Sequence, residues 1–195
     1  MKREITRDDI LPMEEYAANR KERRAKVSEI KKNRRVEVGP FATFYFENYD
    51  TMWHQVHEML YIERGGEDQI AGELEAYNPL IPGEGELVAT VMLEIEDETR
   101  RRRALARLGG FEETATMTFA GETVKGVPEE DVDRTTAEGK ASSVQFITFP
   151  FTAAQVEKFS APDTQVVLGF SHPNYSHMAV LPENVRANLA RDFKS

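Results

Sequence analysis

The chain has 195 residues, a net charge of -9 and no cysteine, which excludes disulfides, thiolate nucleophiles and iron–sulfur ligation by its own side chains. With 40% hydrophobic and 30% charged residues the composition is that of a globular protein, and the acidic balance argues against a nucleic-acid-binding protein. The sequence shows neither an apolar run long enough to cross a membrane nor the apolar core of a signal peptide, so we expect a cytoplasmic protein without a membrane segment.

The first predicted element is a long basic helix that begins near Pro12 and ends near Asn33. Acidic residues lie at its start, where the helix dipole favours them. Its apolar stripe is thin, so we expect it to pack weakly against the core. Its basic residues are Arg20, Lys21, Arg23, Arg24, Lys26, Lys31, Lys32, Arg34 and Arg35. The sequence therefore predicts a basic amino-terminal helix over residues 1–35 and a single α+β domain over residues 36–195.

The remainder mixes strands and helices without a regular βαβ alternation. An aromatic, β-rich segment interrupted by Gly39-Pro40 is followed by a helix from about Asp50, and Gly65-Gly66 separates that helix from a second one. Further strands are predicted within 86–96, 142–151 and 164–170, and a hairpin that turns near Ala120-Gly121 is predicted within 113–128. Further helices are predicted within 97–110, 152–159 and 181–193. We predict an α+β fold with an antiparallel sheet of about five strands, helices packed on one face and the long basic amino-terminal helix standing apart.

The stretch "WHQVHEMLYIE" places two of the four histidines on the first of these two helices. At 100° per residue His54, His57, Glu58 and Tyr61 share one face, while the apolar residues lie opposite. That segregation predicts two imidazoles and a carboxylate facing a shared cavity or solvent. The histidines are three apart, so this is not the His-Glu-x-x-His signature of zinc peptidases.

The other two histidines lie in "GFSHPNYSHMAVLP", at the end of an apolar strand. Divalent metals accept imidazole together with carboxylate, as in non-haem iron and zinc sites. If the helix and this loop meet, the metal ligands would be His54, His57, Glu58, His172 and His177, with Tyr61 and Tyr175 as hydrogen-bonding neighbours. The alternatives are a solvated polar helix face and a metal-free acid/base pair of a histidine with Glu58; no catalytic residue is identified.

The strings "MKREITRDDILPMEEYAANRKERR", "VGPFATFYFENYDTMWHQVHEMLYIE", "AYNPLIP" and "GFSHPNYSHMAVLPENVRANLARDF" resemble the bacterial domain of unknown function 3501 family over essentially the whole chain. The resemblance implies an iron-linked or oxidative-stress setting. Its members often lie beside genes for rubrerythrin-like di-iron proteins and iron–sulfur oxidoreductases, so the resemblance implies these as partners and favours iron over zinc or manganese.

Two functions from different classes follow as expectations. The first is a cytoplasmic protein that binds a divalent metal, iron before others, and acts with redox or oxidative-stress partners. The second is a non-catalytic adaptor that docks partner proteins, or a second subunit in a homodimer, through its basic amino-terminal helix.

Overall fold

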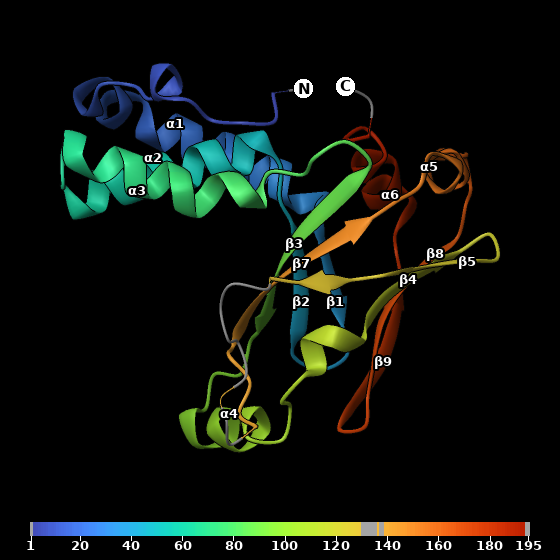
Figure 1. Ribbon diagram of the computed structural model, residues 1–195. Helices are drawn as coiled ribbons and strands as arrows, with labels where there is room; N and C mark the ends of the chain where they lie inside the picture. The colour runs from blue at the N-terminus through green and yellow to red at the C-terminus, as the bar shows by residue number, and fades with distance from the viewer. Residues whose placement is uncertain (1, 130–135, 137–138, 194–195) are drawn as a thin grey trace.

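The structure, a computed structural model, describes residues 2–129, 136 and 139–193. A helical arm lies beside two packed β-sheets (Figure 1). The arm is formed by the segment before Met13, which includes the 3-10 turn η1 (Arg7–Asp9), and by the helices α1 (Met13–Lys32), α2 (Tyr49–Glu63) and α3 (Glu67–Tyr77), the last continued by the turn η2 (Asn78–Leu80).

All strand pairings are antiparallel, and within the described residues the strands form two sheets. The first has the order β1-β2-β3-β7-β6 and the second β5-β4-β8-β9. The strands are β1 (Arg35–Val38), β2 (Ala42–Phe46), β3 (Glu86–Leu93), β4 (Ala115–Phe119), β5 (Glu122–Lys125), β6 (Val127–Pro128), β7 (Val144–Pro150), β8 (Val166–His172) and β9 (Tyr175–Val180). Shorter helices lie between the strands, namely α4 (Glu98–Leu105), η3 (Phe111–Thr114) and α5 (Ala153–Ser160), and α6 (Glu183–Leu189) follows β9.

One core lies between the sheets and a second joins the arm to the first sheet. In the larger core, Phe44 of β2 and Phe170 of β8 stack across the sheets with ring centroids 5.0 Å apart. The smaller core gathers apolar side chains of the arm around Val56, and Val88 of β3 belongs to it. Alternation along β3 explains this division, because successive side chains of a strand point to opposite faces.

Two close contacts join the edges of the sheets. At one edge the chain passes from β5 into β6 through Gly126, whose amide donates to the Ala115 carbonyl (2.9 Å). At the other, the buried Tyr175 of β9 donates its hydroxyl proton to the Val38 carbonyl (2.8 Å) and accepts from the Ala42 amide (3.0 Å). Gly39 lies against this ring with φ of 75°, and a Cβ there would stand 2.7 Å from the Tyr175 hydroxyl.

The antiparallel α+β class and the 20-residue amino-terminal helix are confirmed. The structure adds a second sheet to the one of about five strands. It also shows α1 packed along α2, with Tyr16 and Val27 as the buried residues of α1 (Figure 1). Within the described residues, no helix combines the length and apolar character needed to span a bilayer.

Candidate functional site

Helix α2 carries the polar face that the sequence singled out. Its start is fixed by Asn48, whose side chain accepts from the Thr51 amide while the Thr51 hydroxyl accepts from the Asn48 amide, each at 3.0 Å. Its end is set by Arg64 in the left-handed conformation, with φ of 58°. The helix between them directs His54, His57 and Glu58 toward α1.

His57 does not face a cavity or solvent, because the arm buries it completely. The Leu11 amide donates to its Nε2 (3.1 Å), so Nδ1 carries the ring proton and donates it to the Trp53 carbonyl (2.7 Å). Burial lowers the pKa of His57 to about 4. Both ring nitrogens are therefore engaged in a neutral imidazole that holds the segment before α1 against α2.

Tyr16 of α1 lies between His54 and Glu58. Burial, then Glu58, raises the pKa of this phenol, and its hydroxyl donates to Glu58 Oε1 (2.8 Å). A phenol has one proton to donate, so the 3.0 Å contact with His54 Nδ1 requires that nitrogen to be the donor. Burial lowers the pKa of His54, which leaves its imidazole neutral at pH 7 with the lone pair on Nε2.

Arg20, one turn after Tyr16, closes the cluster. Its Nε and Nη2 donate to the two oxygens of Glu58, each at 2.8 Å, a bidentate pair. The bond from Arg20 holds the pKa of Glu58 at about 2. The guanidinium also lies over the Tyr61 ring, 4.6 Å from its centroid. Glu58 is thus an ionised carboxylate whose charge is already compensated inside the protein.

Beside this cluster α1 and Tyr61 form a groove of about 460 Å³, called here the basic groove. It is lined by Ala17, Arg20, Lys21, Arg24, Ala25 and Tyr61. Lys21 and Arg24 are exposed, and among the described residues neither makes an ion pair or a side-chain hydrogen bond. Two cations without internal partners beside one fixed guanidinium make this groove suited to carboxylates.

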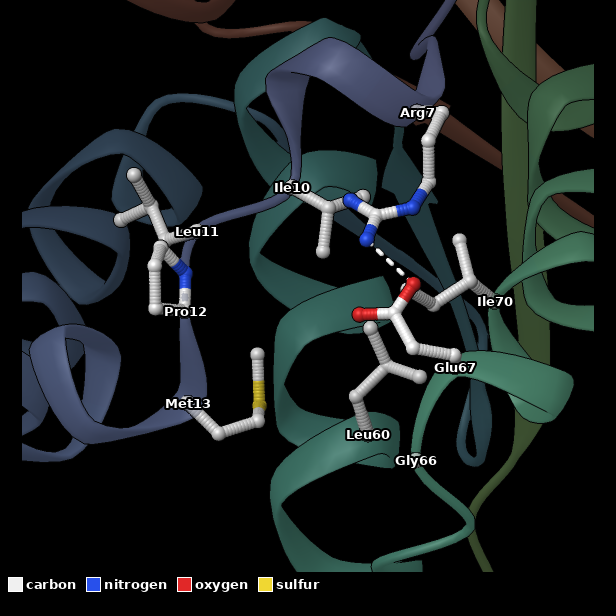
Figure 2. A pocket seen from close by; sticks show the side chains of 9 residues that line it. All are labelled: Arg7, Ile10, Leu11, Pro12, Met13, Leu60, Gly66, Glu67 and Ile70. Carbon is white, nitrogen blue, oxygen red and sulfur yellow. Dashed lines mark hydrogen bonds and ion pairs between the residues drawn. The ribbon is translucent and has the colours of Figure 1, made fainter.

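A second hollow, of about 200 Å³, lies on the side of the arm formed by the segment before α1 (Figure 2). Leu60 and Ile70 line it together with Ile10 and Met13, and the ion pair of Arg7 with Glu67 crosses it. Its two charged side chains are paired with each other and its walls are apolar side chains. This hollow therefore offers no free charged group for binding or catalysis.

The loop histidines lie elsewhere. His172 ends β8 and accepts from the Asn174 amide (3.2 Å), and the exposed His177 packs on the Tyr175 ring, with centroids 4.6 Å apart. Their hairpin and the arm lie at opposite ends of the view in Figure 1. In the part of the chain that the structure describes, no three histidine, aspartate or glutamate side chains come close enough together to hold a metal ion.

The sequence interpretation missed Tyr16 and Arg20 as partners of the α2 face. The sequence places Tyr16 in the thin apolar stripe of the amino-terminal helix and Arg20 among the basic residues of that helix. Their signal is the spacing of four, which places a phenol and a guanidinium on one helix face. That spacing becomes informative only once α1 is known to pack on α2.

Comparison with known proteins gives a family without an assigned activity. The model of the family described as "Protein of unknown function (DUF3501)" matches residues 4–193. A crystal structure of a novel protein of unknown function from Burkholderia pseudomallei is similar, with a TM-score of 0.90 and 38% identity over 97% of this chain and 99% of that one. None of the curated proteins matches. With a family match over nearly its whole length, this chain belongs to the DUF3501 family.

Proposed function

We propose that this protein is a docking protein that binds an acidic segment of a partner protein in the basic groove. The observation that carries the proposal is the pair of exposed cations, Lys21 and Arg24, that have no internal partner within the described residues and line the groove together with Tyr61. In a chain with a net charge of -9 such a local concentration of basic side chains is a distinct electrostatic feature.

The groove is built to keep its shape when it binds. Arg20 is held by Glu58 and by the Tyr61 ring, and about one turn further along α1 Arg23 lies over Trp53, 5.0 Å from the ring centroid. Fixed aromatic and guanidinium groups lose little conformational entropy on association, which favours affinity. Binding through exposed cations is expected to weaken with salt.

Rubrerythrin-like proteins and iron–sulfur oxidoreductases remain the candidate partners, and a cytoplasmic location remains part of this proposal.

The proposal is tested with a fluorescent glutamate-rich peptide of about 12 residues, by polarisation at about 50 and 300 mM NaCl. The variant Lys21→Glu/Arg24→Glu is expected to bind at least about tenfold more weakly than the wild type at the lower salt. The matched control is Arg100→Glu/Arg103→Glu, which makes the same charge change on α4. If both variants lose the same amount of peptide affinity, the effect comes from net charge alone, and the groove is not the binding site.

Metal binding is the second candidate, because His54 presents an unprotonated Nε2 that makes no hydrogen bond within the described residues. Such a nitrogen is a metal ligand by chemistry, whereas Glu58 would first have to leave Arg20. Metal binding is tested by elemental analysis of the tag-free wild type and of the variants His54→Ala and His172→Ala/His177→Ala. Near-stoichiometric iron that is lost in one of these variants supports the proposal; protein that is metal-free and refuses added iron contradicts it.

A further inference from the structure

The exposed face of α3 carries the charge opposite to that of the basic groove. Helix α3 contains no basic residue, and its exposed positions are three acids and three small residues: Glu67, Asp68, Ala71, Gly72, Glu75 and Ala76. Glu67 pairs with Arg7, but Asp68 and Glu75 make no ion pair within the described residues. This face therefore presents two carboxylates without an ion-pair partner among the described residues, next to the small residues Ala71, Gly72 and Ala76.

Gly72 has no explanation within one chain. It lies inside a helix, where glycine is the poorest former after proline, and its φ is not positive. A Cβ at Gly72 would meet nothing within 4 Å, so no neighbour in this chain demands its absence. Close approach of another helix is the ordinary reason for a small residue at such a position.

The basic groove also combines charged and small side chains. Ala17 and Ala25 line it together with the cations of α1, and Ala71, Gly72 and Ala76 are exposed among the acids of α3. In one chain the two surfaces cannot meet, because α1 and α3 lie on opposite sides of α2 (Figure 1). They can meet only between two molecules.

We infer that the acidic segment bound by the basic groove is α3 of a second copy of this chain. Each copy has one groove and one α3 on different sides of the arm, so the contact is head to tail: the groove of one copy takes α3 of the next. Lys21 and Arg24 of one copy then face Asp68 and Glu75 of its neighbour. This inference rests on the proposed function, because it names the occupant of the groove.

A charge-exchange experiment tests it. Sedimentation equilibrium at about 50 mM NaCl is run on the wild type, Lys21→Glu/Arg24→Glu and Asp68→Lys/Glu75→Lys. The wild type is expected to self-associate, and each variant alone is expected to associate at least about tenfold more weakly because the contact becomes repulsive. An equimolar mixture of the two variants is expected to restore association, since every groove can then meet an α3 of opposite charge.

Two further variants serve as a control for net charge and as a test of close contact at α3. Arg100→Glu/Arg103→Glu on α4 is expected to associate as the wild type does. Gly72→Leu places a large side chain on the exposed face of α3 and is expected to abolish association, while its circular dichroism stays that of a folded protein, because the site is open in the single chain.

The inference is overturned if the wild type stays monomeric up to about 1 mM, the dissociation constant that corresponds to a binding free energy of about -4 kcal/mol. It is also overturned if the mixture of the two variants does not associate. If the wild type is monomeric yet binds the glutamate-rich peptide, the second copy is ruled out and the docking function stands. If it does neither, both fail.

Discussion

His57 illustrates how one buried side chain sets the pH range of stability. It is fully enclosed, and its two ring nitrogens bond the Trp53 carbonyl and the Leu11 amide. A second proton would remove the acceptor for Leu11 and place a charge where no water reaches. Neutral His57 therefore belongs to the folded state, and the charged form to the unfolded one.

The stability of the protein is expected to fall on acidification because of His57. Its pKa is about 4 when folded and 6.5 when unfolded, so its contribution is complete above pH 6.5 and is lost as the pH falls toward 4. The loss at pH 4.5 is about 2–3 kcal/mol, from the shift in pKa. Urea unfolding at pH 7.5 and 4.5 measures this loss in the free energy of unfolding. In His57→Gln the part of the pH dependence that comes from His57 should vanish. If the difference in stability between the two pH values is unchanged in the variant, His57 does not have this role.

Tyr175→Phe is expected to lower the free energy of unfolding by about 1–3 kcal/mol, because the buried Val38 carbonyl and Ala42 amide lose their common partner. Tyr45→Phe is the matched control: it removes a bond from a half-buried hydroxyl to Glu94, where water can replace it. Urea denaturation of the two variants should give a clear loss for the first and a small one for the second. Equal losses would mean that Tyr175 does not join the sheets.

For individual residues, the sequence predicts the half of the candidate site that lies on α2. The helical period predicts that His54, His57 and Glu58 share a face, and the structure confirms that they do. Their partners Tyr16 and Arg20 come from a helix more than 30 residues earlier in the chain, and no local pattern states which helix covers which. For the same reason His57 was expected in a cavity and is found buried.

Among the elements, the passage of the chain from β5 to β6 depends on Gly126. A Cβ there would lie 2.6 Å from Ile147 Cγ2 and 3.2 Å from Ala115 Cβ, and both side chains are buried. Gly126→Ala is expected to destabilise the protein by about 1–3 kcal/mol through overpacking. Gly72→Ala, the same change where nothing lies within 4 Å, is expected to stabilise the dilute protein by up to about 1 kcal/mol. Thermal unfolding compares the two, and effects of the same sign would contradict this account.

Local signals predicted single elements well and their pairing poorly. The Gly65-Gly66 break ends α2 at Glu63, and Ala120-Gly121 is the turn between β4 and β5, as the sequence predicts. The pairing of β3 with β7 joins residues more than 50 positions apart, and such non-local register leaves no short-range trace. That is why one sheet of about five strands was predicted where the chain forms two.

On the scale of the whole molecule, a buried ion pair ties the arm to the first sheet and to the carboxyl-terminal segment. Arg34 comes immediately after Asn33, the C-cap of α1, and is 2% exposed, as is Asp192 near the carboxyl terminus. The guanidinium bonds both oxygens of Asp192, and it also donates to the main-chain carbonyls of Phe46 (2.9 Å) and Glu47 (3.0 Å). One side chain thereby connects the end of α1, the end of β2 and the segment after α6.

Breaking this pair from one side is expected to cost more than removing both partners. Asp192→Asn leaves the buried guanidinium without its counter-charge, with an expected loss of about 3–5 kcal/mol in the free energy of unfolding. Arg34→Met/Asp192→Leu removes both charges together with their desolvation cost, so it should recover part of that loss. Glu37→Gln, which breaks the exposed pair with Arg35, should change stability little. Urea denaturation of the three variants separates a buried connection from a surface contact: if Asp192→Asn behaves like Glu37→Gln, the pair does not hold the arm, the first sheet and the carboxyl-terminal segment together.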